Sequence, residues 1–185
     1  MAFIVVYDAC VLYPAPLRDL LIRIANAGIV QAKWSERILD ECFRSILRQR
    51  PDLSAEAFQR TRELMAIAVP DCMVTAFEPL EAGLTLPDPD DRHVLAAAIR
   101  ANAQVIVTFN LEDFPAEVIA PLGIEAKHPD DFLLESLDIA PAAVTRCLVE
   151  QSATLRNPPR SVGDVLGTLQ DLGMVRTAAR FREFL

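Results

Sequence analysis

Apolar residues along the chain follow two spacings, one typical of buried strands and the other of amphipathic helices. Phe3–Tyr7 (FIVVY) is an uninterrupted apolar run rich in β-branched residues, as expected for a central parallel strand covered on both faces. Residues 104–108 (QVIVT) are the next best strand candidate, residues 123–127 a short last one, and residues 73–77 a weak one. These runs predict a small parallel sheet.

Between the strand candidates, apolar side chains recur every three or four positions, which predicts helices with one buried face. Proline is favoured in the first turn of a helix, serine and aspartate at its N-cap, and glycine just past its end. Residues of these types mark the expected boundaries at Pro16, Gly28, Ser35, and Asp52 or Ser54. The predicted helices cover residues 16–27, 35–49, 54–68 and 92–101.

Strands that alternate with helices indicate an α/β fold, with a central parallel sheet and helices on both faces. From about residue 129 onward the pattern is helical, with a break at Asn157-Pro158-Pro159. In open parallel sheets, ligands bind outside the carboxyl ends of the strands. The residues that directly follow each strand are therefore the first place to look for a functional site.

Composition identifies an ordinary folded protein, because 52% of the residues are hydrophobic and 24% are charged. No uninterrupted apolar run reaches the ~18 residues that a membrane span needs, so none is expected. The apolar start of the chain has no basic residue ahead of it and is followed at once by Asp8. It is interpreted as a first strand and not as a signal peptide.

Cysteine and histidine usage argues against a zinc site of the usual composition. There are only two histidines, and the four cysteines include no C-x-x-C pair. Reduced thiols in a cytosolic protein are the simplest interpretation. The widely spaced cysteines are Cys10, Cys42, Cys72 and Cys147.

The net charge of −8 is distributed unevenly. Residues 1–135 hold 12 Lys and Arg against 21 Asp and Glu, a net −9, whereas residues 136–185 hold 6 against 5, a net +1. An acidic body is a poor binder of a phosphate backbone by itself. If the substrate is a nucleic acid, a cation such as a divalent metal must compensate in the site. The simpler alternative is that acidity keeps a small protein soluble.

Acidic residues gather where the predicted strands end. Asp8 directly follows the first strand, Asp113 lies in the loop after residues 104–108, and three aspartates precede the Ala-rich helix 92–101. The predicted topology brings several of them to one edge of the sheet. Carboxylates collected there raise one another's pKa unless a cation intervenes. Hard oxygen ligands without His or Cys suit Mg²⁺ or Mn²⁺, which can activate water for phosphoryl displacement.

The aspartates differ in how strongly the sequence favours a functional role. A carboxylate directly after a buried strand needs a partner, so Asp8 is a functional candidate. Asp91 lies one turn before Val94 and so faces inward more than Asp90 does. Asp88 and Asp90 are interpreted as turn formers and helix caps.

Other polar candidates are less distinct. Glu41 lies off the apolar stripe of its helix, where a solvated carboxylate and one facing a groove look alike. Asp113 lies in a loop, and both interpretations stay open there. His93 and His128 are interpreted as surface or satisfied polar residues and not as ligands.

Four segments, in order and spacing, give the sequence a resemblance to PIN domains over residues 1–135. Each segment alone is weak, but the four together are a strong signal. The segments are Asp8-Ala9-Cys10-Val11-Leu12, Ser35 to Glu41 (SERILDE), Asp91 to Ala98 (DRHVLAAA) and residues 105–114 (VIVTFNLEDF).

The resemblance implies a three-layer α/β/α nuclease that cleaves phosphodiester bonds of single-stranded RNA with Mg²⁺ or Mn²⁺. Many such proteins are VapC-like toxins of bacterial toxin–antitoxin pairs. Their acidic residues hold the ion, which lowers the pKa of an attacking water and neutralises the scissile phosphate. Carried over by position, the resemblance implies Asp8, Glu41, Asp91 and Asp113 as the catalytic metal ligands, Asn110 as an auxiliary polar residue and Thr108 as a residue that orients a carboxylate.

Two features depart from a minimal PIN domain. Cys10 stands where Ser, Thr or Asn is usual, so we expect a hydrogen bond there to be absent or weaker. Residues 136–185 form a helical extension that packs on the nuclease domain of residues 1–135, pairs subunits in a homodimer, or receives an antitoxin. Longer PIN toxins with helical extensions exist, and the chain is interpreted as one of them.

Three other protein classes fit the sequence less well. A catalytically inactive PIN-like module would bind RNA or a protein without cutting, but such members lose carboxylates, and here all four positions are filled. A haloacid-dehalogenase-type phosphatase needs a second Asp two residues after the first, where Cys10 stands. A receiver domain carries its phospho-acceptor Asp on a later strand.

Overall fold

A four-stranded, all-parallel sheet forms the centre of the protein in the computed structural model, which describes residues 3–185. The strands stand in the order β2-β1-β3-β4. Val5 of β1 pairs with Ala32 of β2 on one side and with Val105 of β3 on the other. The strands are β1 (Phe3–Tyr7), β2 (Val30–Lys33), β3 (Val105–Val107) and β4 (Glu125–Lys127).

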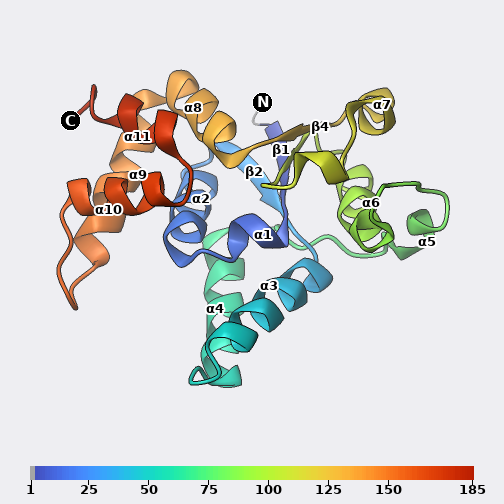
Figure 1. Ribbon diagram of the computed structural model, residues 1–185, viewed down its shortest axis with the longest axis horizontal. Coiled ribbons are helices and arrows are strands. Elements are labelled where there is room, and N and C mark those ends of the chain that lie inside the picture. The colour runs from blue at the N-terminus through green and yellow to red at the C-terminus, as the bar shows by residue number, and fades with distance from the viewer. Residues whose placement is uncertain (1–2) are drawn as a thin grey trace.

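Helices flank the sheet, as Figure 1 shows, which confirms the predicted α/β fold. Helix α2 packs on β2, α6 on β1 and β3, and α7 on β4. Helices α3 and α4 project away from the sheet as one hairpin-like arm (Figure 1). The helices of this part are α1 (Ala9–Leu12), α2 (Ala15–Asn26), α3 (Glu36–Gln49), α4 (Ala55–Ala68), α5 (Glu78–Glu81), α6 (Arg92–Arg100) and α7 (Ala116–Ile119).

Local hydrogen bonds explain where these helices begin and end. The Ser35 side chain accepts from the backbone N–H of Ile38 at 3.2 Å and so caps α3. Ser54 caps α4 in the same way. Gly28 adopts a left-handed φ of 74° just past α2, a conformation that glycine allows at little cost. The predicted boundaries of these three helices are confirmed within a residue or two.

Two expectations about the strands are corrected. Strand β2 was not predicted, because Val30–Lys33 (VQAK) is short and alternates apolar with polar residues. The weak strand expected at residues 73–77 is wrong. Met73 makes a single bridge to Trp34, and Ala76 has a positive φ of 57° that turns the chain away from an extended path.

The C-terminal helices share one apolar core with the sheet. Phe181 and Leu169 are fully buried in the same cluster as Leu20 of α2 and Tyr7 of β1. Helix α8 crosses the expected division at residues 135/136. These helices, gathered on one side in Figure 1, are α8 (Pro129–Ile139), α9 (Pro141–Thr154), α10 (Val162–Asp171) and α11 (Val175–Phe181).

A buried carboxylate joins α8 to α11. Asp130 is 6% exposed, and its oxygens accept from the backbone N–H of Thr177 at 2.8 Å and of Arg176 at 3.2 Å. The Thr177 hydroxyl donates in turn to the Asp130 carbonyl at 3.0 Å. Burial acts to raise the pKa of Asp130, but the hydrogen bonds from Thr177 and Arg176 outweigh it and hold that pKa below its usual value. The charged form therefore stabilises this helix contact.

Two further observations concern the chain as a whole. Among residues 3–185, no helix has the length and apolar character required to cross a membrane. The four cysteines are free thiols.

Candidate active site at the carboxyl edge of the sheet

Asp8 lies where β1 ends and α1 begins. Its Oδ1 accepts from the backbone N–H of Ala9 at 2.6 Å, so the carboxylate caps α1. The side chain is buried, and burial raises its pKa despite the hydrogen bonds that it accepts. A carboxylate held in this way at the carboxyl end of a central strand is positioned by the backbone itself.

Thr108 and Cys10 hold the second oxygen of Asp8. The Thr108 hydroxyl donates to Oδ2 at 2.8 Å, and the Cys10 thiol lies 3.2 Å from the same atom as a donor. The hydrogen bond expected to be absent or weaker at Cys10 is therefore present, and it is made by a thiol, which is a weaker donor than a hydroxyl. Burial and the charge of Asp8 raise the pKa of Cys10 to about 12, which keeps the thiol protonated.

Burial and neighbouring carboxylates both shift the pKa of Asp91. Its pKa is raised to about 7, first by burial and then by the charges of Asp8, Asp113 and Asp88. Asp91 is half-buried and precedes α6, whereas Asp88 caps the preceding turn by accepting from the backbone N–H of Asp90 at 2.8 Å. The acids that the sequence placed at different strand ends are thus electrostatic neighbours.

Glu41 reaches the same place from α3. Its Oε1 lies 2.9 Å from Nε2 of His93 and 3.8 Å from Nε of Arg37. Its charge also acts to raise the pKa of Asp8. The sequence left open whether Glu41 is solvated or faces a groove, and in the structure it faces a groove.

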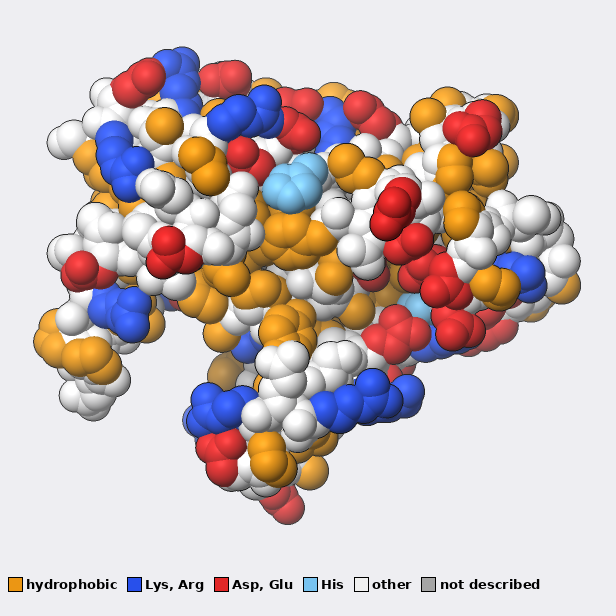
Figure 2. Space-filling model, in the orientation of Figure 1, with side chains coloured by type: hydrophobic (Ala, Val, Ile, Leu, Met, Phe, Trp, Pro, Cys, Tyr) orange, Lys and Arg blue, Asp and Glu red, His pale blue; other side chains and the backbone are white. Residues whose placement is uncertain are grey.

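One cleft of about 530 Å³ brings most of the candidate residues together. Figure 2 shows Asp and Glu side chains gathered in a band between α3 and α6. Asp113 does not line the cleft but is close enough to affect Asp91. The lining residues are Asp8, Ala9, Cys10, Tyr13, Glu41, Cys42, Arg44, Ser45, Asp90, Asp91 and Asn110.

The donor chemistry of this cleft fits a hard divalent cation. The candidate ligands offer carboxylate and amide oxygens, which suit Mg²⁺ or Mn²⁺. The pKa of Asp91 is raised first by burial and then by the negative charge of its neighbours, and a bound cation would offset both effects. Within residues 3–185, no three His, Cys, Asp or Glu side chains converge into a ready metal-binding group. Binding would therefore require these side chains to move closer together.

The interpretation of His93 as a surface or satisfied residue is wrong. The imidazole is fully buried, and within residues 3–185 neither ring nitrogen has a hydrogen-bond partner. The sequence offered a signal, because His93 stands next to the apolar run Val94–Ala98, whose residues are all buried. His128, by contrast, is satisfied: its Nδ1 accepts from the backbone N–H of Asp130 at 3.1 Å.

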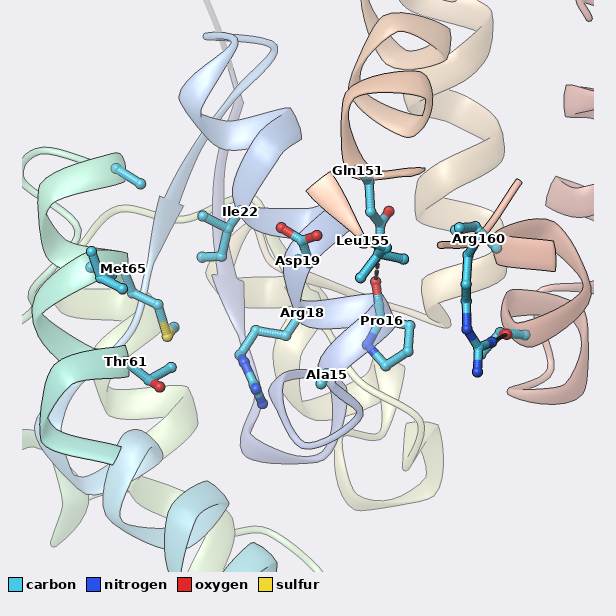
Figure 3. Close-up of a pocket in the computed structure, with 14 residues that line it drawn as sticks. Ala15, Pro16, Arg18, Asp19, Ile22, Thr61, Met65, Gln151, Leu155 and Arg160 are labelled. Atoms are coloured by element: carbon cyan, nitrogen blue, oxygen red, sulfur yellow. Dashed lines mark hydrogen bonds between the residues drawn. The ribbon is translucent and has the colours of Figure 1, made fainter. Parts of the chain in front are cut away.

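A larger recess of about 660 Å³ lies away from the acids. Figure 3 shows it between α4 and the C-terminal helices, with α2 as its floor. Ile22, Met65 and Leu155 give it an apolar lining, and Arg18 and Arg160 also border it. Because no candidate ligand lines this recess, the carboxylate chemistry belongs to the smaller cleft.

Comparison with known proteins identifies the class. Residues 4–112 match the PIN domain family, and residues 129–183 match the VapC50 C-terminal domain. The first match covers more than half of the chain, so the chain belongs to the PIN domain family.

One relative is a protein of Mycobacterium tuberculosis (strain ATCC 25618 / H37Rv) named "Putative ribonuclease VapC50". It is 46% identical to this chain over 80 residues, which are 42% of this chain and 47% of that protein. The similarity thus spans about half the length of that relative. No solved structure matches the chain.

Proposed function

We propose that the protein is a metal-dependent endoribonuclease that cleaves phosphodiester bonds of single-stranded RNA, and the toxin of a type II toxin–antitoxin pair. The observation that carries the proposal is the gathering of Asp8, Glu41 and Asp91 in one cleft at the carboxyl edge of a PIN-family sheet. The name of the M. tuberculosis relative supports the same activity.

In this proposal the ion is Mg²⁺ or Mn²⁺, held by Asp8, Glu41, Asp91 and Asp113. When bound, the ion lowers the pKa of an attacking water and offsets the charge of the scissile phosphate. Thr108 fixes the Asp8 carboxylate through its hydroxyl, and that same hydroxyl accepts from the backbone N–H of Asn110 at 3.0 Å. Asn110 is thereby held at the rim of the cleft, where its amide can contact RNA.

Metal removal tests this function. Purified protein is incubated with a mixed single-stranded RNA pool in Mg²⁺, in Mn²⁺ and in EDTA, and the products are resolved by denaturing electrophoresis. We expect internal cleavage with either metal and none in EDTA, because the crowded carboxylates cannot stabilise phosphate charge by themselves. RNA binding without cleavage in any metal would favour the inactive PIN-like module instead.

The cleft also offers one cation for the RNA backbone. Arg44 is exposed and lines the cleft, and it has no ion-pair partner in the part of the chain that the structure describes. Figure 2 shows Lys and Arg side chains over α3, beside the acidic band. Because an acidic protein needs local positive charge to bind phosphates, we assign Arg44 to a phosphate contact.

We expect Arg44→Ala to weaken RNA binding and to lower the magnitude of the salt slope by about 0.7, the value for one phosphate contact on a single strand. Fluorescence anisotropy of a labelled RNA in EDTA, measured over a range of salt concentrations, gives both quantities. Arg48→Ala is the matched control, since Arg48 is exposed on the same helix but does not line the cleft. Equal losses in both variants would contradict a specific role for Arg44.

The remaining assignments rest on family membership. We propose residues 1–135 as the nuclease domain and residues 136–185 as an extension that packs on it and takes part in binding an antitoxin protein or a second subunit. The match of residues 129–183 to the VapC50 C-terminal domain supports a separate C-terminal part of the chain. An RNA substrate and an antitoxin partner would place the protein in the cytoplasm.

A further inference from the structure

A fully buried, unpaired histidine lies against the proposed active site. His93 is 0% exposed, and neither Nδ1 nor Nε2 has a hydrogen-bond partner among residues 3–185. Buried polar side chains are almost always hydrogen-bonded, so an exception needs an explanation. A residue kept only to fill the core would more simply be apolar.

The surroundings of His93 supply a reason. Its Nε2 lies 2.9 Å from Oε1 of Glu41, a close contact whose alignment falls short of hydrogen-bond geometry. Arg37 approaches the same oxygen at 3.8 Å. Both residues make their closest approach to Glu41 at Oε1. Oε1 is therefore the oxygen of Glu41 that faces His93.

The contact also joins the two walls of the cleft. Glu41 is on α3, whereas His93 is in the first turn of α6, two residues after Asp91. A movement of α6 that shifts Asp91 would also shift the imidazole beside Glu41. His93 thus links the position of Asp91 on α6 to the position of Glu41 on α3.

We propose that His93 is a positioning residue, which donates its Nε2–H to Oε1 of Glu41 and so leaves Oε2 to bind the divalent metal. The inference rests on the proposed nuclease function. A neutral imidazole protonated at Nε2 is sufficient as the donor. Residues behind metal-ligating side chains commonly act in this way, by fixing the orientation of the ligand.

The test compares two substitutions at this position. His93→Phe retains an aromatic ring but removes the donor, whereas His93→Gln places an amide N–H near the position of Nε2. The readout is the dissociation constant for Mn²⁺, measured by isothermal titration calorimetry without RNA. Thermal melting in EDTA shows whether each variant is folded.

We expect His93→Phe to bind Mn²⁺ about 10–100-fold more weakly, the usual cost of losing a residue behind a metal ligand. His93→Gln should restore most of the affinity. In a Glu41→Gln background, His93→Phe should cause little further loss, because the two residues act as one unit.

Three outcomes would overturn the inference. Wild-type affinity in His93→Phe would show that the contact does not matter for the metal. Equal losses in the Phe and Gln variants, or additive losses with Glu41→Gln, would indicate a purely structural histidine. If the wild-type protein itself binds no Mn²⁺, the proposed metal site fails and this inference fails with it.

Discussion

Asp8→Asn is expected to slow metal-dependent RNA cleavage at least about 100-fold, while the protein stays folded. Loss of a residue behind a metal ligand already costs about 10–100-fold, and Asp8 is proposed as a ligand itself. The amide keeps the size of the carboxylate and one oxygen, which can still accept from the backbone N–H of Ala9, while its NH2 group replaces the oxygen that accepts from Thr108. The charge that would bind the metal is removed.

Initial rates on a defined RNA, at saturating Mn²⁺ and in EDTA, measure this effect. Circular dichroism and thermal melting show that the variant is folded. Asp90→Asn is the matched control, because Asp90 lines the same cleft but is exposed and belongs to the turn before α6. It should cleave at close to the wild-type rate. Undiminished cleavage by Asp8→Asn would show that the active site is elsewhere or that the cleavage comes from a contaminating nuclease.

Asp130→Ala is expected to lower the free energy of unfolding by about 2–3 kcal/mol at pH 7, since it leaves one buried and one partly buried backbone donor of α11 without their acceptor. The hydrogen bonds that it removes come from the backbone N–H groups of Thr177 and Arg176. Urea unfolding followed by circular dichroism measures the difference. Asp138→Ala is the control, because Asp138 is an exposed residue of the same helix. Its cost should stay within about 0.5 kcal/mol.

The effect of Asp130→Ala should also depend on pH. The folded-state pKa of Asp130 is lowered, so its contribution is fully present above the unfolded-state pKa of about 3.9 and is lost as the pH falls below it. The difference between wild type and variant should therefore narrow below about pH 4. A difference that is constant from pH 7 to pH 3 would contradict the role of the charged form.

Strong local signals allowed most of the fold to be predicted. The buried run Phe3–Tyr7 and the caps Ser35 and Ser54 are where the sequence analysis expected them. Val30–Lys33 was missed because a four-residue strand with two polar side chains owes its conformation to pairing with β1. Tertiary pairing of this kind leaves little trace in a single sequence.

The candidate site was predictable where the backbone positions the side chain. Asp8 was predicted because it directly follows the end of β1, and Asp91 because it directly precedes the start of α6. The surroundings of Glu41 depend on how α3 packs against α1, which no local pattern encodes. His93 was missed because its proposed role depends on a contact with Glu41, which lies 52 positions earlier in the sequence.

The hydrogen bond between Thr108 and Asp8 spans 100 residues of sequence, and it forms only after β3 has paired with β1. Contacts of such long range carry a large loop-closure entropy and form late in folding. During synthesis the chain emerges from its N-terminus first, so a nascent chain that lacks β3 has Asp8 without its partner. An incomplete chain would thus be inert, and any activity would begin only once more than half of the sequence has been made and folded.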